Sequence, residues 1–249
     1  SKGTDPTTTN LQGHWKFDDG VQSTTISDGD PVTQWQSKEG ERKLFTQATT
    51  SKRPTYNASS INGEPTLTFD GTDDLLTLAE QYLTDTAGVI FIVFKPSSVT
   101  AHYNLFGSSD EATGATYRFL VRASNLTSIK KPAVLQVSND TTTRVYANET
   151  TTTAGTEYIL MIASNGTAYE IRVDGADQTE TVDAGTDNGD WFGDTDNRDN
   201  MTIGASKYNT EAGHYPGDIA EIIIYSEDKT TNEKQQVEEY LSDRYGITI

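Results

Sequence analysis

Apolar residues occur along the chain in short runs, separated by clusters of glycine, asparagine and aspartate. Some runs alternate apolar and polar positions and others are wholly apolar, which is typical of strands buried on one or on both faces. Helical patterns do not alternate with these runs, so the pattern favours an antiparallel all-β sandwich. The predicted strands are 13–17, 65–69, 75–78, 88–94, 116–122, 132–137, 157–163, 168–173, 201–205 and 218–225.

The clearest local prediction is a β-hairpin over residues 157–174. Asn165 and Gly166 separate two strand-like runs, and both residue types tolerate the positive φ angles of a two-residue type I′ turn. Asp174-Gly175 is a candidate for a second turn directly after this hairpin.

One helix is predicted, at the C-terminal end of the chain. Thr230 and Glu233 have the spacing of a capping box, in which each side chain accepts a hydrogen bond from the backbone of the other. Gly246 is suited to end the helix, because glycine readily adopts the left-handed conformation. The residues that share one helical face are Val237, Tyr240, Leu241 and Arg244.

The expected domain organisation rests on the length of the chain and on the polar composition of its first ten residues. Residues 1–10 are rich in threonine and lack apolar periodicity, so we expect a flexible N-terminal arm or linker. A sandwich often uses about 200–250 residues as one unit, so one domain is expected over 11–249. No apolar run reaches the roughly 20 residues of a transmembrane helix and the first residues do not resemble a signal peptide, so no membrane insertion is expected.

Composition excludes several classes of chemistry. The chain has no cysteine, which rules out disulfides, thiolate nucleophiles and cysteine-based metal sites. Its net charge is −18, from 37 acidic and 19 basic residues, and such a surface repels phosphate backbones, so nucleic acid is not an expected partner. The acidity has two interpretations that remain open: a well-solvated surface, or adaptation to high salt.

Several stretches together resemble the concanavalin A-like lectin/glucanase superfamily, in particular its laminin-G-like jelly-roll domains. The resemblance covers residues 11–247 and depends on the order of its motifs more than on any one of them. The motifs are DGDPVTQW at 28–35, RPTY at 53–56, INGEPTLTFDGTDDLL at 61–76, GDIAEIIIYS at 217–226 and the helical EKQQVEEYLSDRYGI at 233–247.

The resemblance implies two curved antiparallel sheets. Members of this superfamily bind sugars, proteins or calcium, or cleave polysaccharides, so the fold alone does not choose a function. One departure concerns the segment after Trp35. The family usually continues there with an Asp-x-Ser-Gly-Asn-Gly turn, whereas this chain has QSKEGER, so no ligand contact is carried over to Ser37, Lys38 or Glu39.

Asp70, Asp73 and Asp74 form a compact acidic group in FDGTDD, and it has two interpretations. Calcium takes six to eight oxygen ligands, so these carboxylates would need further donors, for instance Asp18 or Asp19. Alternatively, Asp70-Gly71 forms a turn in which the carboxylates accept backbone N–H groups. The turn is the preferred interpretation; calcium is the one candidate cofactor.

The loop at 183–200 is rich in aspartate and contains Trp191 and Phe192. An aromatic ring flanked by acids and amides suits a sugar, because the flat ring faces the C–H side of the sugar and the acceptors meet its hydroxyl groups. The alternative is that both rings fill the edge of the core. Trp191 is nevertheless the leading candidate for a ligand contact.

A second candidate loop, at 207–218, contains Tyr208, Asn209, His214 and Tyr215, and the pair His102-Tyr103 forms a similar loop. The three histidines of the chain are far apart in sequence and show no zinc-binding spacing.

Catalytic motifs are lacking. Polysaccharide cleavage commonly needs two carboxyl groups across the scissile bond, yet no Glu-x-Asp occurs in the chain. G-x-S-x-G and phosphate-binding loops are also missing.

The sequence therefore favours a non-catalytic recognition or adhesion module. Its expected partner is a glycan or a surface receptor, at a cell surface, on a virus particle or elsewhere outside the cell. The alternative is a structural subunit of an assembly, such as a capsid-decorating protein or a tail-fibre domain, with neighbouring subunits as partners. A polysaccharide-degrading enzyme with unrecognised acids is the third hypothesis.

Overall fold

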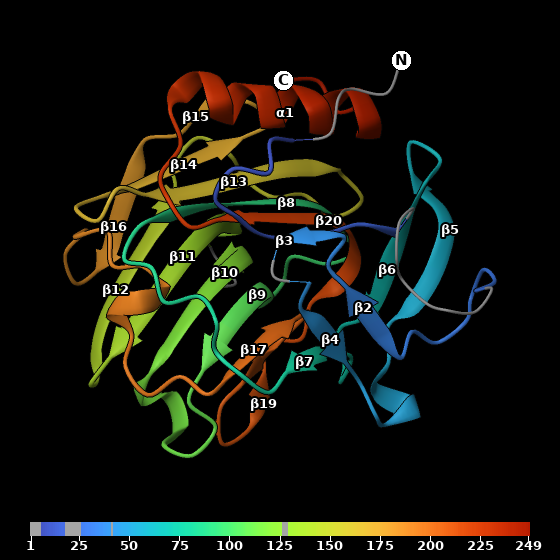
Figure 1. Ribbon diagram of the computed structural model, residues 1–249, viewed down its shortest axis with the longest axis horizontal. Coiled ribbons are helices and arrows are strands. Elements are labelled where there is room, and N and C mark those ends of the chain that lie inside the picture. Colours follow the sequence, from blue (N-terminus) through green and yellow to red (C-terminus); the bar gives the residue numbers. More distant parts are fainter. Residues whose placement is uncertain (1–5, 18–25, 41, 126–128) are drawn as a thin grey trace.

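The computed structural model describes residues 6–17, 26–40, 42–125 and 129–249. Two large antiparallel sheets pack face to face, and helix α1 (Thr231–Tyr245) lies across the outer face of one of them (Figure 1). This arrangement confirms the predicted two-sheet β-sandwich with one C-terminal helix. Three short 3-10 helices are also present among these residues: η2 (Thr50–Lys52), η3 (Gly114–Thr116) and η4 (Phe192–Asp194).

The helix-bearing sheet, called sheet A, has nine strands in the order β15-β14-β13-β8-β20-β1-β3, with β6 also paired to β20 and β5 paired to β6. Its strands are β1 (Leu11–Trp15), β3 (Glu39–Gly40), β5 (Thr55–Ile61), β6 (Glu64–Asp70), β8 (Gly88–Pro96), β13 (Tyr158–Ser164), β14 (Tyr169–Val173), β15 (Ala176–Asp177) and β20 (Pro216–Tyr225).

The opposite sheet, called sheet B, has nine strands in the order β16-β12-β11-β10-β9-β17-β7-β4-β2. A small hairpin, β18 (Ser206–Lys207) with β19 (Glu211–Ala212), stands beside it. The strands of sheet B are β2 (Gln34–Gln36), β4 (Leu44–Thr46), β7 (Leu76–Leu78), β9 (Tyr103–Ser109), β10 (Arg118–Asn125), β11 (Lys131–Ser138), β12 (Thr141–Ala147), β16 (Glu180–Ala184) and β17 (Asn200–Ile203).

The wholly apolar strands of sheet A are buried on both faces. In β8, Ile90, Ile92 and Phe94 face the core between the sheets, while Val89, Phe91 and Val93 face α1. This double burial explains why GVIFIVF has no polar position, since each of its faces packs against an apolar layer.

Helix α1 begins and ends where the sequence predicts. The Thr230 side chain accepts a hydrogen bond from the backbone of Glu233, whose own side chain accepts one in return, and Gly246 is left-handed with φ 66°. The four residues of the predicted face, Val237, Tyr240, Leu241 and Arg244, are all buried.

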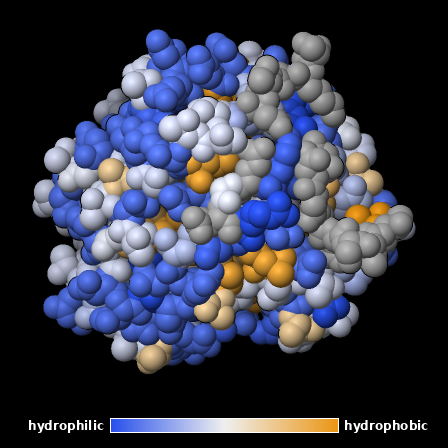
Figure 2. Space-filling view, viewed as in Figure 1, coloured by the Kyte–Doolittle hydropathy of each residue, from blue (hydrophilic) through white to orange (hydrophobic). Residues whose placement is uncertain are grey.

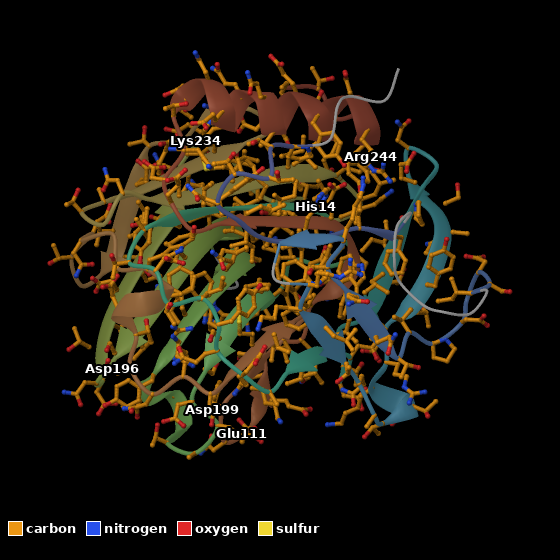
Figure 3. The ribbon with its side chains drawn as sticks, viewed as in Figure 1. His14, Glu111, Asp196, Asp199, Lys234 and Arg244 are labelled. Atoms are coloured by element: carbon orange, nitrogen blue, oxygen red, sulfur yellow. The ribbon has the colours of Figure 1, made fainter. Side chains whose placement is uncertain are left out.

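A β-bulge in β20 places a carboxylate beneath the helix. The pairing of β20 with β8 shifts between Ile219 and Glu221, so Ala220 and Glu221 both face α1 instead of alternating. Glu221 is 1% exposed and accepts hydrogen bonds from Nε2 of His14 (2.5 Å) and from the hydroxyls of Tyr240 and Tyr245 (2.8 Å each). His14 lies beneath α1 in Figure 3, and Arg244 lies at one end of the helix.

The predicted hairpin at 157–174 is confirmed, but its turn is not a two-residue type I′ turn. Ser164 pairs with Tyr169, which leaves a four-residue loop, and of the Asn165-Gly166 pair only the glycine has a positive φ. Asn165 instead accepts hydrogen bonds from Thr167 and Ala168 through its side chain. The two-residue turn lies at the second predicted position, where Asp174 and Gly175 both have positive φ.

The described part of the N-terminal arm is attached to the domain. Residues 1–5 lie outside the description, but the carbonyl of Thr7 accepts a hydrogen bond from the hydroxyl of Tyr225, and that of Thr9 accepts one from Nζ of Lys229. The carbonyl of Asn10 accepts the backbone N–H of Ser226. Residues 7–10 therefore contact the C-terminal part of the domain, and the flexibility of the arm stays a prediction.

The molecular surface in Figure 2 is mostly hydrophilic, with a few small hydrophobic areas. Within the described part of the chain no helix is both long and apolar enough to cross a bilayer.

Candidate functional site

A groove of about 730 Å³ lies on the outer face of sheet B, the face turned away from the core. Its size falls in the range of small-molecule sites, about 300–1,000 Å³. Polar and aromatic side chains dominate the lining, and none of the described residues that line it is aspartate or glutamate. The side chains used below are His102, Asn104, Arg118, Arg122, Leu135, Arg144, Tyr208 and His214.

Strand β10 supplies the floor of the groove through simple alternation. Phe119 and Val121 point into the core, so Arg118, Leu120 and Arg122 point outward. Leu120 pairs with Leu135 of β11, and these two side chains form a small apolar cluster with Val137. Of this cluster, Leu135 lines the groove, together with the guanidinium groups of Arg118 and Arg122.

Gly213 allows the segment before β20 to close against the floor. Its φ is 64°, and a Cβ atom there would lie 2.2 Å from Nδ2 of Asn104, so a larger residue would displace this side chain. The carbonyl of Gly213 accepts the backbone N–H of Asn104. Asn104 in turn accepts a hydrogen bond from Nε of Arg122 (3.2 Å) through Oδ1.

Two of the predicted ligand residues line this groove. The Tyr208 ring lies 5.3 Å from the guanidinium carbon of Arg118, a cation–π geometry. His214 donates from Nδ1 to the carbonyl of Asp74 at 3.4 Å if that nitrogen carries the proton. His102, paired in sequence with Tyr103, also lines the groove, as does Tyr103.

Two other residues of the same predicted loop do not line it. Asn209 is exposed, in the turn between β18 and β19. Tyr215 is fully buried in the core, where its ring packs against Phe69 and Phe94. The sequence does not show which residues of this loop face the groove, because adjacent residues in an extended segment point to opposite sides.

Trp191 and Phe192 require a correction. They are 2% and 0% exposed and lie in the core between the sheets, with their rings 5.1 Å and 4.3 Å from Phe119. Gly88 makes room for the indole, since a Cβ there would lie 2.4 Å from Nε1 of Trp191. Their rings have no face open to a ligand, which supports the alternative that they fill the edge of the core.

The aspartates of the 183–200 loop mainly organise the backbone. Asp194 accepts the backbone N–H of Trp191 (2.8 Å), and Asp187 accepts that of Tyr169 (3.0 Å). Asp199 accepts the backbone N–H of Glu111 (3.0 Å), and both lie far from α1 in Figure 3. These aspartates therefore stabilise the backbone of the loop and of the segments next to it.

The carboxylates of Asp70, Asp73 and Asp74 lie within 4.8 Å of one another. Oδ1 of Asp70 accepts the backbone N–H groups of Thr72 (2.7 Å), Asp73 (3.3 Å) and Asp74 (3.4 Å), and Asp74 accepts that of Asp70 (2.9 Å). Burial, together with the charges of its two neighbours, raises the pKa of Asp74 to about 6. These contacts fit the turn interpretation; Asp18 and Asp19, considered as further calcium ligands, lie outside the described residues.

We expect millimolar calcium, added in high sodium chloride, to change the melting temperature little. Oxygens already engaged by backbone N–H groups are poor ligands, whereas a specific site would add about 2.7 kcal/mol at a hundredfold excess over Kd. Thermal melts with calcium and with EDTA measure this. Asp70→Asn is the matched variant, because the amide keeps the Oδ1 acceptor of the turn. An upward shift that EDTA reverses and Asp70→Asn removes would establish a calcium site.

No protein-family model and no curated protein sequence matches the chain, whereas many solved structures do. One is domain 4 of AbnA, a GH43 extracellular arabinanase from Geobacillus stearothermophilus, in complex with arabinotriose. It has a TM-score of 0.59 and 14% identity, over 93% of this chain and 98% of that chain. Another is the CBM40 of the Ruminococcus gnavus IT-sialidase bound to α2,3 sialyllactose, with a TM-score of 0.54 and 12% identity, over 83% and 94%.

The NanB sialidase from Streptococcus pneumoniae also matches, with a TM-score of 0.53 and 17% identity, but over 69% of this chain and only 26% of that chain. At such identities the likeness concerns the fold alone. It agrees with the lectin-like β-sandwich expected from the sequence, while membership of the laminin-G-like group stays a prediction.

Proposed function

We propose that this chain is a glycan-binding module and that the groove on sheet B holds the sugar. The observation that supports this most directly is the composition of the groove. Leu135 and the Tyr208 ring line the same groove, and both suit the C–H faces of a sugar. Asn104, Arg118 and Arg122 converge on the same space with side chains that can meet hydroxyl groups.

The comparisons support the same class of ligand. The AbnA domain is in complex with arabinotriose and the CBM40 is bound to sialyllactose, so two chains with this fold hold short glycans. For this chain, which shares only 14% and 12% identity with them, a glycan partner is our inference from both the fold and the groove.

The lining of the groove favours binding of a glycan without its cleavage. Hydrolysis of a glycosidic bond commonly uses a pair of carboxyl groups that flank it. The described lining contains no carboxyl side chain to act as acid, base or nucleophile. We therefore propose a module that attaches to a glycan-bearing surface without cleaving it. Its location outside the cell is inferred from the similar AbnA domain, which is part of an extracellular arabinanase.

Tyr208→Ala is expected to weaken glycan binding by about tenfold, equivalent to about 1.4 kcal/mol, because it removes the exposed aromatic wall of the groove. A glycan array identifies the ligand, and calorimetric titration measures the affinity. Asn209→Ala is the matched control, since it changes the adjacent, exposed residue that does not line the groove. Equal loss in both variants, or none in either, would remove the groove as the binding site.

A further inference from the structure

The groove carries a charge opposite to that of the whole molecule. The chain has 37 acidic and 19 basic residues, yet the described residues lining the groove include Arg118, Arg122 and Arg144 and no carboxylate. This segregation concentrates positive potential in the groove.

The three arginines gather there because of strand register. Arg118 and Arg122 lie two residues to either side of Leu120 on β10, so all three face outward. Leu135 of β11 pairs with Leu120 on one side and with Arg144 of β12 on the other. Arginines from two strands therefore surround Leu135 in the groove.

Neutral groups hold two of these arginines in position. Arg122 is 7% exposed and donates to Oδ1 of Asn104 (3.2 Å) and to Nδ1 of His102 (3.3 Å). Arg118 lies against the Tyr208 ring, and its Nε is buried without a hydrogen-bond partner among the residues described. These contacts orient the planar groups without contributing negative charge.

Arg144 differs, because it donates from Nε to Oδ2 of Asp183 (2.6 Å) outside the groove lining. It still affects its neighbours. Burial, followed by the charges of Arg118 and Arg144, lowers the pKa of Arg122 to about 10. An anion bound in the groove would offset this repulsion.

We propose, building on the glycan-binding function above, that the ligand is an acidic glycan whose carboxylate or sulfate group faces Arg118 and Arg122. A guanidinium group matches the oxygens of such an anion with two parallel hydrogen bonds. In a partly buried groove this charge-assisted contact is stronger than in open water. Leu135 and Tyr208 then contact the uncharged part of the sugar ring.

The experiment compares neutral glycans with acidic counterparts of the same core. An array that contains neutral, sialylated, uronic-acid and sulfated glycans is followed by titration of lactose, sialyllactose and sulfated lactose. We expect the acidic members to bind about tenfold or more tightly than the neutral parent, and to lose this advantage at about 1 M sodium chloride. The preferred member identifies the anion.

Arg118→Gln is expected to weaken binding of the acidic glycan by about tenfold and binding of the neutral parent by much less, so that the preference for the acidic glycan falls. Arg118 is only partly buried, so this variant is expected to fold, and a thermal melt checks this. Arg122→Lys keeps the charge but loses the planar pair of donors, and a partial loss is expected. Arg42→Gln is the control, because it removes the same charge from an exposed residue outside the groove.

The outcomes separate this proposal from the function on which it rests. If the array yields only neutral glycans, or if Arg118→Gln weakens neutral and acidic members equally, the acidic class is wrong while glycan binding stands. If the folded wild-type protein binds no glycan at all, both proposals fail. A loss that is clearly larger for acidic members than for neutral ones, and absent in Arg42→Gln, supports the assignment.

Discussion

Truncation of the chain after Ser226 is expected to abolish cooperative folding. Helix α1 covers the outer face of sheet A with Val237, Tyr240, Leu241 and Tyr245, none of which is more than 4% exposed. Loss of one large buried side chain typically costs about 2–5 kcal/mol. A domain is stable by only about 5–15 kcal/mol, so the deletion removes about as much stabilisation as the whole fold possesses.

The measurement is a denaturant or thermal melt followed by circular dichroism. Leu241→Ala tests the same contact in the full-length chain, with an expected loss of about 2–5 kcal/mol. Glu239→Ala, on the exposed side of the same helix, is the matched control and is expected to change stability by about 0.5 kcal/mol or less. A truncated chain that melts cooperatively at the full-length temperature would show that α1 is dispensable.

The strands and the helix could be predicted where local pattern and tertiary packing agree. GVIFIVF and DIAEIIIY are apolar on both faces because they lie in the middle of sheet A between the core and α1. The helix carries its own start and stop signals at Thr230 and Gly246.

Polar strands were missed because their local pattern does not agree with the packing they adopt. In β12, TTTRVYA, only Val145 enters the core near the middle of the strand, and the Thr-rich remainder resembles a loop. Strand β9, YNLFGSS, similarly ends in Gly and Ser, although all of it except Tyr103 is buried. Such strands form because sheet neighbours supply their hydrogen bonds, which the local sequence does not reveal.

The candidate site was only partly predictable. Tyr208 and His214 were found because they lie in a loop with aromatic and polar residues, but the same reasoning chose Trp191, whose burial depends on Gly88 and Phe119 far away in sequence. The arginines were missed even though a signal exists. In TYRFLVR the strand alternation places Arg118 and Arg122 on the side opposite to Phe119 and Val121, so a strand prediction already implies two cations on one face.

Glu221→Ala is expected to destabilise the protein by about 3–5 kcal/mol, the typical cost of removing one partner from a buried ionic group. The Glu221 carboxylate lies between sheet A and α1 and accepts from His14, Tyr240 and Tyr245. Nε of Arg244 also lies 3.5 Å from its Oε2. Alanine would leave these groups with fewer partners in a region that water does not reach, and would open a cavity beneath the helix.

The size of the loss should depend on the whole network and not on one contact. Tyr245→Phe removes a single hydroxyl and is expected to cost about 0.5–1.5 kcal/mol. In the double variant with Glu221→Ala, the second change is expected to cost less than it does alone, because the hydroxyl has already lost its acceptor. Chemical denaturation of the four proteins measures this coupling. Strictly additive costs would show that the hydrogen bond between Tyr245 and Glu221 adds no stability of its own. A Glu221→Ala variant as stable as wild type would show that this carboxylate does not contribute to the attachment of α1.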